Sequence, residues 1–171
     1  MLAACATTQD SSTHSSDSGV EQISFEAEPG FGCGRCDSFK IIAYSDGRVW
    51  IEHGYWAVEK DGEYSDWQIV HRRDRVAPER FRRLRDDLLP YRPDGTVLLG
   101  DEASCRIYAT DSGGLHVKWH GPSSDAHLRI DLGCVSETLQ PTMNAVKVAP
   151  SKLGIPDLPE PWSQWAVAST E

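Results

Sequence analysis

Residues 115–132 read LHVKWHGPSSDAHLRIDL, and this stretch decides the fold class. Apolar side chains occupy every second position in its two halves. They are Leu115, Val117, Trp119, Leu128, Ile130 and Leu132. A period of two is typical of β-strands that bury one face, and the Gly- and Pro-containing segment 121–126 predicts a turn. The stretch therefore predicts two antiparallel strands of a sheet with one side against a core.

Earlier parts of the chain repeat this pattern. We expect strands at residues 23–27, 39–44, 48–53, 56–59 and 64–71. The second and third are separated by Ser45-Asp46-Gly47, and the last two by a segment containing Asp61-Gly62. Asp-Gly pairs favour tight hairpin turns because glycine accepts positive φ. These segments predict an antiparallel meander.

Two segments have helical periodicity instead. The first is expected to begin at Pro78, which suits a first helical turn, and to end at Pro90. The second is expected to begin near Thr138 and to end before Pro150. Their inward-facing residues should be Phe81, Leu84, Leu88, Met143 and Val146. The sequence thus predicts an α+β domain at 21–154, an antiparallel sheet of about five to seven strands with two helices packed on one face.

Charge is unevenly distributed along the chain. The formal net charge is −9, which argues against nucleic-acid binding. Arginine is nevertheless concentrated between residues 72 and 85, where it could contact anionic lipid or glycan. Acidic residues stand at helical i,i+4 spacing in the pairs Glu79–Arg83, Arg82–Asp86 and Arg83–Asp87. A solvated, internally paired face is therefore the favoured interpretation.

The N-terminus indicates export. Met1-Leu2-Ala3-Ala4-Cys5 resembles the lipobox of bacterial lipoprotein precursors, which implies palmitate-type lipidation and membrane anchoring at Cys5. Residues 1–4 would then be the remnant of a signal peptide whose basic and apolar parts lie upstream. The polar segment 5–20 is expected to be a disordered tether. Ala6 after the lipidated cysteine implies an outer-membrane lipoprotein facing the periplasm or the cell surface. The alternative is a cytosolic protein with a chance Ala-Ala-Cys.

The stretch Phe31-Gly32-Cys33-Gly34-Arg35-Cys36-Asp37-Ser38-Phe39, followed by a strand, Asp46-Gly47 and a second strand, resembles a bacterial family. The family is domain of unknown function 6438, whose members read Cys-Phe-Gly-x-Cys-Pro-x-Tyr before the same strand, Asp-Gly and strand. The likeness extends over residues 22–148 and includes a Thr-Asp bend at Thr110-Asp111. The cysteine spacing and Asp37 depart from the family pattern. The resemblance implies a shared fold and an envelope setting, with no catalytic residues.

Four cysteines remain once Cys5 is lipidated. They are Cys33, Cys36, Cys105 and Cys134. An even number in an exported domain predicts disulfides, with three possible connectivities. A thioredoxin-like site is disfavoured because a strand follows Cys36. Covalent haem would need histidine at Asp37, and a four-cysteine zinc site would need a second close pair.

The pairing of Cys105 with Cys134 depends on the segment between residues 105 and 114. If 105–109 were a strand paired with 115–120, the two cysteines would lie about 20 Å apart, beyond the roughly 7 Å limit for a disulfide. An irregular connector would let them meet. The Thr110-Asp111 bend of the resembled family favours the connector, so we expect a Cys105–Cys134 bond.

Histidines offer a weaker metal site. His120 and His127 face each other if Trp119 pairs with Leu128, but that register also opposes Lys118 and Arg129. A shift by two residues pairs Lys118 with Asp131 instead and separates the imidazoles. Ordinary surface histidines are therefore the favoured interpretation of His120 and His127.

No catalytic motif occurs in the sequence. We expect a non-enzymatic envelope module without cofactors that binds an envelope protein or a small ligand, or supports envelope integrity. The alternative is a thiol–disulfide enzyme or metal carrier that uses Cys33 and Cys36. The Pro- and Trp-rich end, residues 155–171, is expected to be an extended arm over the domain.

Overall fold

The computed structural model describes residues 20–30, 36–58, 64–122, 125–156 and 158. One mixed sheet of seven strands dominates them, in the order β4-β3-β2-β1-β7-β8-β5. The strands are β1 (Gln22–Pro29), β2 (Ser38–Tyr44), β3 (Arg48–Val58), β4 (Tyr64–Arg75), β5 (Thr96–Leu99), β7 (Gly113–His120) and β8 (Ala126–Asp131). All neighbours are antiparallel except β5, which runs parallel to β8.

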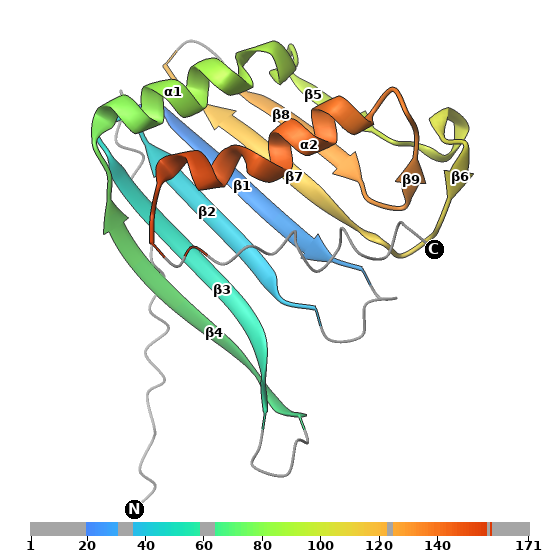
Figure 1. Ribbon diagram of the computed structural model, residues 1–171, viewed down its shortest axis with the longest axis horizontal. Coiled ribbons are helices and arrows are strands. Elements are labelled where there is room, and N and C mark those ends of the chain that lie inside the picture. Colours follow the sequence, from blue (N-terminus) through green and yellow to red (C-terminus); the bar gives the residue numbers. More distant parts are fainter. Residues whose placement is uncertain (1–19, 31–35, 59–63, 123–124, 157, 159–171) are drawn as a thin grey trace, which may run out of the picture.

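Both helices lie on the same face of the sheet, as Figure 1 shows, and the predicted α+β architecture is confirmed. They are α1 (Pro78–Leu88) and α2 (Gln140–Val148). Single 3₁₀ turns η2 (Leu89–Tyr91), η3 (Glu102–Ser104) and η4 (Ala149–Leu153) join the elements, and β6 (Ile107–Tyr108) pairs with β9 (Cys134–Val135) in a small second sheet. In the described part of the chain, no helix is long and apolar enough to cross a membrane.

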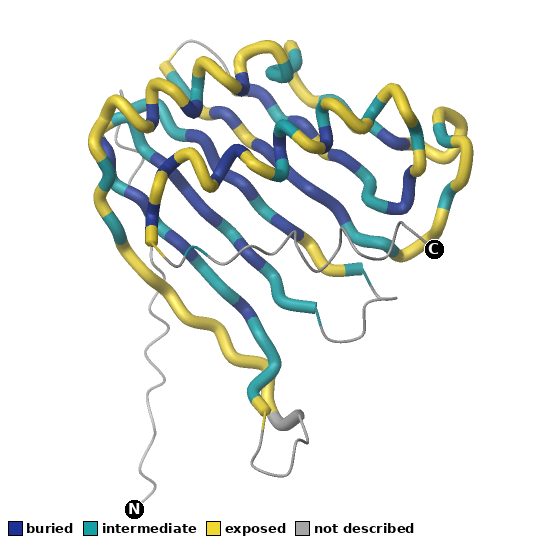
Figure 2. Tube along the Cα trace, in the orientation of Figure 1, coloured by how far each residue is buried: buried dark blue, intermediate teal, exposed yellow. Residues whose placement is uncertain are grey.

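The core lies between the sheet and the two helices. The buried residues in Figure 2 follow the strands beneath α1 and α2, whereas β4 is exposed along much of its length. The expected alternation is confirmed: every second residue of the central strands is buried, together with the predicted helical stripes. The most deeply buried large side chains among these are Phe25, Ile23, Ile41, Leu115, Val117, Leu128, Ile130, Phe81, Leu84, Leu88 and Val146.

Three strands of the main sheet differ from the sequence-based expectation, and the short strands β6 and β9 were not predicted, with β6 lying in the segment 105–114 that was expected to be an irregular connector. The segments predicted at 48–53 and 56–59 form one strand, β3, whose pairing with β4 shifts register between Trp56 and Val58. Strand β4 continues to Arg75, so three of the clustered arginines lie on a strand. Strand β5 was not predicted, because its four residues show no alternation and it is held by parallel pairing with β8.

The pairing of β7 with β8 corrects both registers considered from the sequence. Val117 lies opposite Leu128, and Lys118 lies opposite His127 rather than Arg129 or Asp131. Asp131 is held at the end of β8, where its carboxylate accepts hydrogen bonds from the Gly133 N–H and the Tyr108 hydroxyl. Asp131 lies opposite Gly114 of β7, at the far end of the hairpin from the turn.

The start of the predicted C-terminal arm is anchored to the domain. Ile155 is buried in the core, and the Pro156 carbonyl accepts a hydrogen bond from Arg72 of β4. Leu158 packs against the same core. Residues 159–171, Cys5 and the tether predicted at 5–20 lie outside the described residues, except for Val20, which directly precedes the domain.

Candidate functional site

The helix-free face of the sheet carries two chemically different regions. Because side chains alternate along a strand, half of each strand's residues point away from the helices. Strands β2, β3 and β4 contribute the region called here the aromatic half, which consists of Ile42, Trp50, Trp56, Trp67 and Ile69. Strands β1, β7 and β8 contribute the imidazole half, which consists of Glu26, Glu28, His116, Lys118, His127 and Arg129.

Ring contacts order the aromatic half. Trp56 and Trp67 lie edge to face with centroids 5.5 Å apart, and Trp50 stacks on His71 at 5.3 Å. The Trp67 ring lies directly over Gly54, where an added Cβ would stand 2.3 Å from the ring. Because Gly54 has no side chain, the Trp67 ring can pack against its backbone.

Strand β4 forms an open edge of the sheet. It stands at the end of the strand order, so within the described chain its outer backbone groups pair with no other strand. Its side chains Trp67, Ile69 and Val70 are among the exposed large hydrophobic residues, and Ile69 is 54% exposed. Natural edge strands are usually shielded by charge, and here the charges are concentrated toward Arg72–Arg75. The first part of the edge is thus accessible and presents the apolar Trp67 and Ile69 on the helix-free face, with Asp66 and Gln68 alternating with them.

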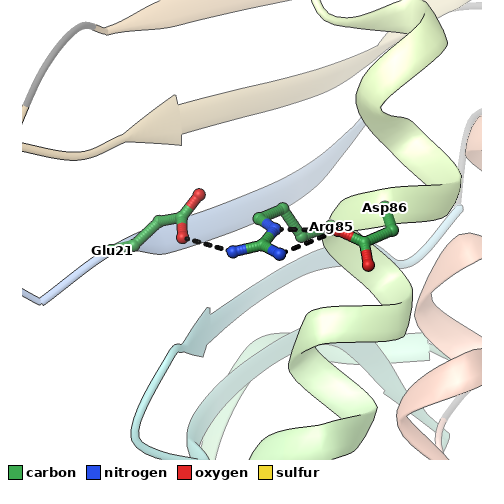
Figure 3. Close-up of polar contacts among 3 residues, drawn as sticks. All are labelled: Glu21, Arg85 and Asp86. Atoms are coloured by element: carbon green, nitrogen blue, oxygen red, sulfur yellow. Dashed lines mark hydrogen bonds and ion pairs between the residues drawn. The ribbon is translucent and has the colours of Figure 1, made fainter.

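Within the described residues, three of the seven clustered arginines form ion pairs with nearby acidic groups. Arg85 reaches from α1 to Glu21 and Asp86, as Figure 3 shows. Arg72 pairs with Asp74, and Arg82 with Glu79. None of the three i,i+4 pairs expected from the sequence is present in the described part; Asp87, for example, binds Lys152 of η4 instead. The acidic residues of α1 therefore pair either with nearer arginines of the same helix, as Glu79 and Asp86 do, or with a tertiary neighbour, as Asp87 does.

Two histidines meet at the centre of the imidazole half. His116 Nδ1 lies 3.1 Å from His127 Nε2, and the two rings stack with centroids 5.3 Å apart. The two residues are diagonal neighbours across β7 and β8, since Lys118 lies directly opposite His127. His116 is only 7% exposed, which is unusual for a polar residue on the helix-free face.

Four charged side chains surround this pair. Glu28 Oε2 lies 3.2 Å from His116 Nε2, but outside hydrogen-bond geometry, so that nitrogen is buried without a hydrogen-bond partner. Lys118 binds Glu26 at 3.3 Å, and Arg129 lies opposite His116. Burial lowers the pKa of His116, and burial together with the charge of His116 lowers the pKa of His127. Both imidazoles are consequently neutral at pH 7, with ring nitrogens able to act as ligands or bases.

The disfavoured alternative, in which His120 and His127 face each other, does not form. His120 Nδ1 lies 2.6 Å from Asp125 Oδ1, in the turn between β7 and β8, while His127 contacts His116. The two-residue difference in register is the cause. In the described residues, no cluster of three or more His, Cys, Asp or Glu side chains is arranged to hold a metal ion.

The cysteine prediction is confirmed for one pair. Cys105 and Cys134 form a disulfide with Cα atoms 5.3 Å apart. Asp111, in the predicted bend after β6, adopts φ of 61°, and the pairing of Tyr108 in β6 with Cys134 in β9 brings the segments of the two cysteines side by side. Cys36 is also disulfide-bonded, and Cys33 lies outside the described residues.

A second histidine contact follows Cys36 directly. His53 Nε2 donates a hydrogen bond to Asp37 Oδ2 at 2.8 Å, and its ring stacks on Phe39 with centroids 4.3 Å apart. Both partners are about a quarter to a third exposed, His53 at 24% and Asp37 at 30%. An oriented imidazole beside a carboxylate can transfer a proton, although sequence reasoning did not single out either residue.

No protein-family model and no curated protein matches this sequence.

Proposed function

We propose that this chain is a bacterial envelope lipoprotein, lipidated at Cys5, whose domain binds another envelope protein and catalyses no reaction. The lipobox-like sequence before Cys5 supports the anchor. The observation that carries the binding function is strand β4, an apolar edge without a pairing strand in the described chain.

The chemistry of this edge indicates what it would bind. An edge strand has backbone N–H and C=O groups available to a further strand, and such strand addition gives affinity through the main chain. Trp67 and Ile69 offer apolar contact beside it, and Arg73 and Arg75 follow on the same face. An extended partner segment with apolar residues next to acidic ones fits both parts of the edge.

Site-specific photo-crosslinking in cells tests this proposal. A photoreactive residue at Ile69 should crosslink to one discrete envelope protein, and Trp67→Asp should abolish that crosslink without changing the circular dichroism spectrum. Val148 of α2 is a matched control, because its exposure of 53% nearly equals the 54% of Ile69. Equal crosslinking from both positions, or none from Ile69, would refute the edge as the binding surface.

The anchor needs its own experiment. Expressed behind a lipoprotein signal sequence, the chain should incorporate labelled palmitate and fractionate with outer membranes. A Cys5→Ser variant should lose both properties. If fractionation is unchanged in that variant, the lipoprotein assignment is wrong.

One observation favours a second candidate, a thiol–disulfide enzyme at Cys33 and Cys36. The Asp37–His53 hydrogen bond places a proton-transfer pair next to the disulfide-bonded Cys36. A redox site should exchange rapidly with glutathione and reduce insulin, whereas a structural bond should resist mild reductant. Insulin reduction that requires His53 would establish the enzyme and overturn the binding module.

A further inference from the structure

The histidine pair of the imidazole half has the geometry of two adjacent metal ligands. Zinc–imidazole bonds are about 2.0–2.1 Å long, so two nitrogens at a tetrahedral angle lie about 3.3 Å apart. His116 Nδ1 and His127 Nε2 are separated by 3.1 Å, close to that distance, and a rotation of the two rings would turn both lone pairs from each other toward one ion. We propose that these two nitrogens bind a divalent transition-metal ion of the zinc and copper class.

The buried nitrogen of His116 supports the same site. A metal on Nδ1 leaves the proton of the neutral ring on Nε2, the atom that has no hydrogen-bond partner in the metal-free chain. Glu28 Oε2 lies 3.2 Å away and needs only a change of angle to accept that proton in a hydrogen bond. Carboxylate, imidazole and metal in this order are a recurrent arrangement in metal sites, because the carboxylate fixes the ring and raises its basicity.

The surrounding charges determine which ions fit. Glu26 and Glu28 contribute two negative charges, and Lys118 and Arg129 two positive ones, so the site has no net charge to attract a hard cation. Its affinity must come from imidazole nitrogen, which suits Zn²⁺, Ni²⁺ and Cu²⁺ rather than Mg²⁺ or Ca²⁺. Water completes the coordination. Glu26, directly opposite His116 on β1, is the nearest candidate for a third protein ligand if it leaves Lys118.

Calorimetric titration of the full chain with Zn²⁺ tests this site, with Mg²⁺ as the hard-ion comparison. We expect one Zn²⁺ per chain and no binding of Mg²⁺. His127→Gln should remove this Zn²⁺, and Glu28→Gln should weaken it about tenfold, the usual effect of losing a supporting carboxylate. Zn²⁺ should also raise the melting temperature of the native chain but not that of His127→Gln.

Two other histidines provide matched controls. His71 contacts Glu52, and His120 contacts Asp125, so each is an imidazole beside a carboxylate outside the proposed pair. His71→Gln and His120→Gln should bind Zn²⁺ as the native chain does. Undiminished binding by a folded His127→Gln variant, no binding by the native chain, or loss in His120→Gln alone would each overturn the proposal.

Discussion

The aromatic half and the imidazole half belong to one face of one sheet, yet they differ in how far their side chains are exposed to solvent. Ile69, on the edge strand β4, remains 54% exposed, whereas His116, on the interior strand β7, is 7% exposed. Long charged side chains from both neighbouring strands cover His116, but β4 has a neighbour on one side only. Position in the strand order therefore determines which side chains can be covered without a helix. Substitutions in and around the two halves test whether they are stabilised separately, and one outside both gives the effect of an ordinary surface ion pair.

The largest effect is expected from removing the disulfide with Cys105→Ala/Cys134→Ala. The bond closes a loop with a sequence separation of 29, so its loss should lower the free energy of unfolding by about 3–4 kcal/mol. The bond adjoins β9 and, through Tyr108 and Asp131, the end of β8. Hydrogen exchange should accelerate in β8 while β3 changes little. Equal acceleration in both strands would show that the two halves are not stabilised separately.

A change in the aromatic half comes next. Gly54→Val places a side chain where the rigid Trp67 ring lies, and such overpacking should cost about 1–3 kcal/mol. Urea unfolding measures the loss, and tryptophan fluorescence should shift to longer wavelength as the ring becomes solvated. Gly95→Val is the control for β-branching, because no atom lies within 4 Å of an added Cβ there, although its positive φ also carries a backbone cost. An unshifted fluorescence spectrum for Gly54→Val would contradict the packing of Trp67 against Gly54.

The imidazole half predicts a smaller, pH-dependent effect. Burial lowers the pKa of His116 and His127 in the folded chain, whereas in the unfolded chain a histidine has its ordinary pKa of about 6.5. As the pH falls through that value, the unfolded chain therefore binds more protons than the folded chain. The free energy of unfolding should therefore fall as pH drops from about 7.5 to 5.5. Urea unfolding with a chelator present measures this decrease in the free energy of unfolding. The decrease should be smaller in a His116→Gln/His127→Gln variant and as large as in the native chain in His71→Gln. The same slope in all three chains would contradict it.

The smallest effect should come from an ion pair outside both halves. Arg85 is 39% exposed beside Glu21 and Asp86, and partly exposed pairs contribute little after solvent screening. Arg85→Gln should change the free energy of unfolding by less than about 0.5 kcal/mol in urea titrations. A loss above 1 kcal/mol would mean that the link between α1 and the start of β1 stabilises the sheet itself.

Local patterns predicted much of the fold, and relationships between distant segments account for what they missed. Asp46-Gly47 and the stripe through Phe81 and Leu84 are local signals, and both elements form as expected. The β7–β8 register is different: the apolar alternation of the two strands fits equally well after a shift of two residues. The observed register, with Val117 opposite Leu128, follows from pairing between the two strands that a period within each strand does not reveal.

The candidate sites show the same division. Neither register weighed from the sequence puts His116 next to His127, so their diagonal contact was not predicted. The only signal in the sequence for this contact was the alternation of side chains along the two strands, which places both imidazoles on the same face of the sheet. The Cys105–Cys134 bond was expected, because the resembled family supplied the bend at Thr110-Asp111 that the residue pattern left open.

The central position of β1 has a consequence for the order of folding. Phe25 lies opposite Val117, about ninety residues later in the chain, so the sheet closes only after most of the domain has been delivered. A chain that emerges N-terminus first can form strands β1 to β4 before the rest of the sheet. Until β7 pairs with it, β1 is then an apolar edge strand, although it lies in the middle of the finished sheet. During that interval the nascent domain is open to pairing with neighbouring chains, and rapid arrival of β7 protects it from aggregation.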